Sequence, residues 1–248
     1  MDGKLAEAVL LTSHVRVAFA NIQPFTLSRE HPSFAGTASL TFEIDDGQGW
    51  SGAATQVASS LAGWFEYLQA SAARACGLVG GVLCVSGPAG ERVWRQSMDV
   101  VKPRPADGRI WAVRYREFDA KAAWPQVSLE ASAARLLEVL VECQALAHDA
   151  AEAGWAKFFD NARHELNPPT DSLVQASHLL PALGYSAAAQ RLLRGCELAW
   201  AFGGMGSWND LDFADVEHRR RYGRLTPQLK TAVLEGICAA VNSELNTQ

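Results

Sequence analysis

The segment with the most chemical potential lies near the C-terminus, between residues 202 and 217. It begins Phe-Gly-Gly-Met-Gly-Ser-Trp-Asn-Asp, with three glycines within four residues. Glycine-rich loops can hold phosphates, but a dinucleotide-binding loop follows a strand and spaces its glycines G-x-G-x-x-G, and a Walker loop ends in Gly-Lys-Ser/Thr. Neither pattern is present, so a turn is favoured over a phosphate site. We expect Gly203 to end the preceding helix in a left-handed conformation, and Ser207 with Asp210 to form a capping box.

Four acids follow in the same segment, namely Asp210, Asp212, Asp215 and Glu217. Together they could hold a hard cation or meet the basic surface of another protein, although their spacing differs from that of a calcium-binding loop. Trp208 beside them has two interpretations, an exposed anchor for a partner or a side chain that fills the core, since tryptophan is common in both settings. Trp208 and the four acids form the predicted partner-binding surface.

Other pairs of reactive side chains have weaker patterns. Asp160 and His164 lie four residues apart on a predicted helix, but the second histidine of the zinc-protease motif is missing, so a surface ion pair is favoured. Cys143 and His148 would lie about 140° apart around a helix and cannot face each other. The five cysteines form an odd set without a CxxC pair, which is typical of reduced thiols in a core. We therefore expect no catalytic residue, no metal site and no cofactor.

Length and charge exclude several classes of protein. A chain of 248 residues with 48% hydrophobic and 20% charged residues is long and apolar enough to bury a large core. Its net charge of −5 argues against general nucleic-acid binding, which needs a positive surface. Residues 1–11 do not resemble a targeting segment, and the apolar run 78–85 is too short to span a bilayer. We expect a cytoplasmic protein.

The first half of the chain has the period-two pattern of half-buried strands. One helix interrupts it, because apolar residues recur at helical spacing over 57–72. Residues 86–90 are typical of a turn that joins the strands on either side into a hairpin. The expected strands are 15–19, 38–44, 78–85, 93–101 and 111–115.

The second half changes to a period of 3.6 after Trp124-Pro125. Serines before two of the apolar segments are typical N-caps, and Thr226-Pro227 is typical of a cap followed by proline at the first helical position. The basic run 218–221 has two interpretations, a helix end with Gly223 beyond it or a binding patch. The expected helices are 128–143, 155–166, 172–183, 186–200 and 226–245.

These patterns predict an α+β fold. Residues 1–120 would form a mostly antiparallel sheet with one covering helix, and residues 121–248 would form a helical part packed on it. No linker separates the two parts, so they are also compatible with one continuous domain.

The expected helix over 192–202 and the glycine string that follows it resemble uncharacterised bacterial proteins, some of which are similar to immunity proteins of polymorphic toxin systems. The resemblance covers the last quarter of the chain. It implies a protein that neutralises a cognate toxin, and it gives no catalytic residues to carry over.

The first hypothesis is therefore a non-catalytic immunity protein that covers the active site of a toxin with a basic surface. One rival is a hydrolase or nucleotide-handling enzyme that uses the 203–212 loop with a divalent metal on Asp210 and Asp212. A second rival is a structural subunit that assembles through its helical half. The sequence does not define the oligomeric state or the chemistry of the toxin.

Overall fold

The computed structural model describes residues 1–45, 47, 52–101, 103, 106–119, 127–168 and 175–246. The chain divides into two compact units, one over Gly3–Pro125 and one that comprises Met1–Asp2 with Gln126–Asn246. The boundary expected at 120/121 lies outside the described residues. Each unit has its own core.

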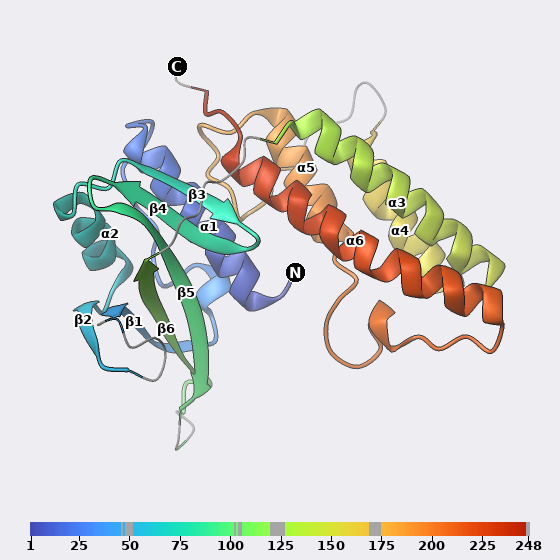
Figure 1. Ribbon diagram of the computed structural model, residues 1–248, viewed down its shortest axis with the longest axis horizontal. Coiled ribbons are helices and arrows are strands. Elements are labelled where there is room, and N and C mark those ends of the chain that lie inside the picture. The colour runs from blue at the N-terminus through green and yellow to red at the C-terminus, as the bar shows by residue number, and fades with distance from the viewer. Residues whose placement is uncertain are drawn as a thin grey trace. The chain divides into compact units, whose positions relative to one another are not determined.

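The N-terminal unit contains a six-stranded sheet in the order β2-β1-β6-β5-β4-β3 (Figure 1). Only β1 and β6 pair in parallel; the other four pairs are antiparallel. The α+β fold class, with a mostly antiparallel sheet followed by a helical half, is confirmed. The strands are β1 (Thr37–Asp45), β2 (Ala54–Ala58), β3 (Ala75–Val79), β4 (Val82–Gly87), β5 (Gly90–Val100) and β6 (Trp111–Asp119).

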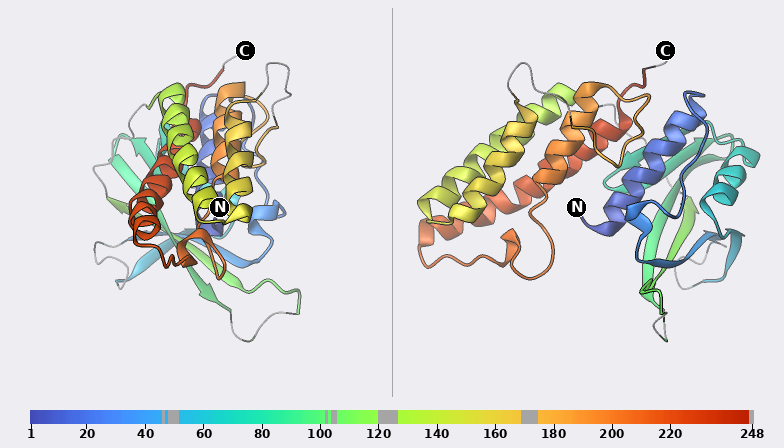
Figure 2. Two further views of the ribbon diagram at one scale, coloured as in Figure 1. Left: turned by 90° about the vertical axis from the view of Figure 1, so that its right-hand side faces the viewer. Right: turned by 180° about the vertical axis from the view of Figure 1, so that it is seen from behind.

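Two helices cover the same face of this sheet, α1 (Gly3–Phe19) and α2 (Leu61–Ala70). Phe42 of β1 stacks on Trp64 of α2 at 4.9 Å and on its register partner Tyr115 of β6 at 5.2 Å. Tyr115 in turn binds Glu7 of α1, so α1 lies across the same face (Figure 2). Stacked aromatic rings therefore form the centre of this core.

Two strand predictions were wrong. Residues 15–19 belong to α1, which buries residues around its whole circumference, including Leu10, Leu11 and Val15, and so has no clear helical period. Residues 78–85 form two strands instead of one. Gly80 and Gly81 have φ values of 56° and 84°, which place a tight turn between β3 and β4. The structure also has a second covering helix, α1, where the sequence predicted only α2.

The C-terminal unit is a four-helix bundle of α3 (Leu129–Asp149), α4 (Ala153–Leu166), α5 (Ala187–Leu198) and α6 (Val216–Asn242). Neighbours pack in the ring α3-α4-α5-α6, and α6 closes the ring on α3. The predicted caps Ser128 and Ser186 accept hydrogen bonds from the backbone N–H of Ala131 and Ala189. Gly236 lets α6 approach α5 closely, because a Cβ there would lie 2.6 Å from Cys196 Sγ.

Three helix predictions in this half were wrong. The helix α6 begins at Val216 with Asp215 as N-cap and continues through Pro227, so the basic run 218–221 lies at its start. Buried Leu225 and Leu229 on both sides of the proline hold one continuous helix, and this packing outweighs a proline penalty of about 3 kcal/mol. Residues 175–183 contain no helix, and 172–174 lie outside the described residues. The helix α5 ends at Leu198 with the right-handed residue Ala199, so Gly203 is not its cap.

A carboxyl group is buried in the N-terminal core. The Glu7 side chain accepts a hydrogen bond from Tyr115 Oη at 3.0 Å and another from Gln96 Nε2. Burial raises the pKa of Glu7 from 4.5 to about 7, against the opposite effect of the two hydrogen bonds. The folded unit therefore favours the protonated acid.

The contribution of Glu7 to the stability of the N-terminal unit should fall as the pH rises. Below about 4.5 Glu7 is protonated in both states, and above that only the unfolded state releases the proton until the folded pKa near 7 is passed. We expect Glu7→Gln to be more stable than the wild type at pH 8.5, by at most about 3.5 kcal/mol at ~1.4 kcal/mol per pKa unit. Urea unfolding at pH 5, 7 and 8.5 measures this.

The matched control is Glu66→Gln, since Glu66 is an exposed glutamate on α2. Burial lowers the pKa of His14 to about 4, and this group opposes Glu7 below pH 6.5, but it is common to all three proteins and cancels in the comparison. Equal stabilities of Glu7→Gln and the wild type at pH 8.5 would contradict a raised pKa of Glu7 in the folded state.

Candidate functional site

The segment 199–215 connects α5 to α6, and Trp208 fixes its position. The Trp208 Nε1 donates to Thr226 Oγ1 at 3.0 Å, and its backbone carbonyl accepts from Tyr222 Oη at 2.8 Å. Its backbone N–H donates to the carbonyl of Ala201 at 3.0 Å. The tryptophan thus links the start of the segment to α6.

The ring of Trp208 lies in the bundle core and is fully buried. Ring centroids of Phe159 and Trp155 on α4 lie 4.9 and 5.4 Å away, and that of Tyr222 on α6 lies 5.5 Å away. Of the two interpretations of Trp208, the structure places it as a core-filling side chain. The surface of the segment is therefore made by its other residues.

Two of the four predicted acids are structural caps. Asp210 accepts hydrogen bonds from the N–H of Ser207 at 3.0 Å and from its hydroxyl at 3.3 Å, which form the predicted capping box at the turn η3 (Trp208–Asp210). Asp215 accepts from the N–H of His218 at 2.8 Å at the start of α6. This hydrogen bond lowers the pKa of Asp215, so it stays ionised.

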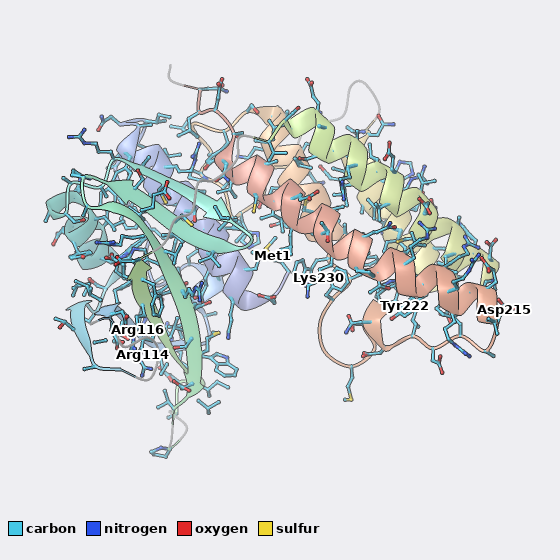
Figure 3. All side chains as sticks on the ribbon, viewed as in Figure 1. Met1, Arg114, Arg116, Asp215, Tyr222 and Lys230 are labelled. Carbon is cyan, nitrogen blue, oxygen red and sulfur yellow. The ribbon has the colours of Figure 1, made fainter. Side chains whose placement is uncertain are left out.

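The other two acids pair with arginines of α6. Asp212 has a side chain that is 91% exposed and lies 3.8 Å from Arg219. Glu217 binds Arg220 through two hydrogen bonds of 3.0 and 2.9 Å, which lower the pKa of Glu217. Figure 3 shows Asp215 at one end of α6 and Tyr222 further along the same helix. Asp212 and Glu217 therefore lie beside arginines, which partly offset their negative charge.

The acids do not converge on one point. No cluster of three or more potential metal-ligating side chains occurs among the described residues. Asp160 and His164 lie 3.4 Å apart as an exposed pair on α4, in agreement with the favoured interpretation. Each of the five cysteines is a reduced thiol, and burial raises the pKa of the Cys143 thiol to about 12. Cys143 is therefore not an activated nucleophile.

Met205 is the prominent residue that sequence reasoning missed. Its side chain is fully exposed, at 104% of the reference area, and it lies between Gly204 and Gly206. Gly206 has a φ of 83°, and no atom lies within 4 Å of a Cβ built on Gly203, Gly204 or Gly206. Glycines have no side chains with which to cover a neighbour, and this composition could have indicated an exposed methionine.

A second exposed apolar pair lies in the N-terminal unit. Val100 and Trp111 are register partners on β5 and β6, and they are 43% and 36% exposed. The alternation placed Trp111 correctly in a strand, on the same side as Val113 and Tyr115. Those two side chains are buried, whereas Trp111 at the start of the strand is exposed. Among the tryptophans in the described ranges, Trp111 is exposed and the others are buried or half-buried.

Comparison of the chain with protein-family models, curated proteins and solved structures gives no match. Within the described ranges, no helix has both the length and the apolar character needed to cross a membrane.

Trp208 and Trp111 should respond differently to truncation. We expect Trp208→Ala to destabilise the protein by about 3–5 kcal/mol, because it removes a buried ring and its bond to Thr226. Trp111→Ala should have a much smaller effect, since part of that ring is already in water. Urea unfolding followed by far-UV circular dichroism compares the two. Equal losses would contradict the core position of Trp208.

Proposed function

We propose that this chain is a non-catalytic protein that binds another protein through residues 203–217. More specifically, it acts in the cytoplasm as an immunity protein that covers the active site of a cognate toxin with a basic surface.

The observation that carries this proposal is the full exposure of Met205 on a loop whose base is fixed by Trp208. Transfer of a large apolar side chain from water into an apolar pocket of a partner lowers the free energy. Methionine is enriched at interfaces and adapts its shape to irregular pockets. The buried base of the loop reduces the entropy lost on binding, because the segment is already ordered.

The acids of the 203–217 segment are the residues that would meet a basic partner. Asp212 is highly exposed and its contact with Arg219 is long, so it can exchange that arginine for one on a partner. Asp210 and Asp215 each accept the backbone hydrogen bond through one carboxylate oxygen, Oδ2 in Asp210 and Oδ1 in Asp215. Charge complementarity of this kind speeds association and selects partners.

The two rivals have less support. The enzyme hypothesis needs Asp210 and Asp212 on one metal ion, yet Asp210 is engaged by Ser207 and Asp212 lies beside Arg219. Assembly through the helical half would use exposed apolar residues of the bundle such as Leu183, which is 52% exposed. Leu183 precedes the start of α5, whereas the segment 203–217 follows its end. The two surfaces can therefore be tested separately.

The probe for the proposal is the protein encoded by the adjacent reading frame. We expect it to bind the wild-type chain and to lose its toxicity on co-expression. Met205→Ala should raise the dissociation rate about 10-fold, which corresponds to ~1.4 kcal/mol at an interface anchor. The Asp210→Asn, Asp212→Asn, Asp215→Asn triple variant should associate about 10-fold more slowly at low salt, because it removes the negative charge that attracts a basic partner.

Asparagine is chosen because it is also a good N-cap, so the triple variant keeps its fold. Leu183→Ala is the matched control and should bind normally. Failure of the wild-type chain to bind the probe contradicts the proposal. Weak binding by Leu183→Ala alone would favour assembly through the bundle, and metal-dependent hydrolysis of a nucleotide or phosphate ester lost with Asp212→Asn would favour the enzyme.

A further inference from the structure

The sulfur atoms of this protein differ sharply in their access to solvent. Among the five cysteines four are buried and Cys238 is half-buried. Among the three methionines, Met1 and Met98 are half-buried, whereas Met205 is fully exposed. We infer that Met205 is the site at which peroxides oxidise the folded protein, and that the sulfoxide switches off the 203–217 surface without disturbing the fold. The second clause rests on the proposed function.

The geometry leaves the Met205 sulfur open to attack. Its neighbours in the chain are glycines, and a Cβ added to Gly203, Gly204 or Gly206 would meet no atom within 4 Å. A peroxide can therefore approach without any movement of the backbone. Met98 lies on β5 opposite Val113 in the sheet, where a reagent has access to only part of the side chain.

The thiols compete poorly for the same oxidant. A cysteine reacts with peroxide as the thiolate, and burial raises the pKa of the Cys76, Cys143 and Cys196 thiols above the usual value. A thioether needs no deprotonation. Exposure alone therefore governs its rate.

The reaction is balanced by the peroxide. The Met205 sulfur attacks one peroxide oxygen, an S–O bond forms and the O–O bond breaks, and the second oxygen leaves as water when the oxidant is hydrogen peroxide. The sulfur is oxidised by two electrons and the peroxide is reduced by two. Methionine sulfoxide reductases reverse the change with reducing equivalents from a thiol.

The product should change binding and leave stability unchanged. A sulfoxide is polar and resists burial in an apolar pocket of a partner. In the free protein no core contact of Met205 is lost, because its side chain is fully in water. Oxidation would thus weaken recognition while Trp208 continues to hold the loop.

The test treats the folded protein with hydrogen peroxide and follows each sulfur by peptide mass spectrometry. We expect Met205 sulfoxide to form at least about 10-fold faster than oxidation of Met98, Met1 or Cys238, and to disappear on incubation with methionine sulfoxide reductases. In urea the rates at Met98 and Met205 should become similar. The melting temperature of the oxidised protein should equal that of the untreated one. Comparable folded-state rates at Met98 or Cys238, or a lower melting temperature, would overturn the inference.

The binding readout uses the protein of the adjacent reading frame and Met205→Leu as control. The sulfoxide form should bind about 10-fold more weakly, and Met205→Leu should bind normally and be insensitive to peroxide. If Met205→Ala weakens binding but the sulfoxide does not, the switch is refuted and the proposed function stands. If neither Met205→Ala nor the asparagine variant affects binding, the proposed function fails, while the mass spectra still decide whether Met205 is the oxidation site.

Discussion

Burial of Trp208 is the interaction on which the candidate surface depends. Its ring contacts Trp155 and Phe159 of α4 and Tyr222 of α6, and its Nε1 donates a hydrogen bond to Thr226 of α6. Its backbone carbonyl accepts a hydrogen bond from Tyr222. Its backbone also binds Ala201, so the chain must leave the bundle and return between residues 201 and 208. The loop that results contains three glycines and cannot cover its own methionine. Exposure of Met205 follows from the fixed position of Trp208.

The acids of the segment serve structure and, under the proposed function, recognition. Asp210 and Asp215 accept hydrogen bonds from backbone N–H groups, so their carboxylates cannot move far. Glu217 is held by Arg220. An exposed pair of this kind contributes little to stability, because water screens it. It does fix where charge lies on the surface. Fixed charge is more useful for selecting a partner than for holding a fold.

The predictions that rested on local chemistry at the starts of helices and turns were confirmed. Ser128, Ser186 and the Ser207–Asp210 capping box follow from the side-chain oxygens that helices and turns require at their starts, and each is present. The strand over 38–44 followed from its alternation. Two predictions failed where tertiary packing determines the secondary structure. Burial around all of α1 removed its helical period, and packing on both sides of Pro227 kept α6 continuous. Neither the depth of Trp208 nor the exposure of Met205 is a property of a sequence window, because each depends on which helices surround the segment.

The two units place carboxyl groups in opposite settings. Glu7 lies in an aromatic core, where burial favours its neutral form and moves its titration to near neutral pH. Asp215 and Glu217 lie in water beside donors, which lower their pKa and keep them ionised throughout that range. A change in pH around 7 therefore alters the free energy of the N-terminal unit and leaves the charge of these acids in the 203–217 surface unchanged. Under the proposed function, recognition would respond to oxidation at Met205 and would be insensitive to modest changes in pH.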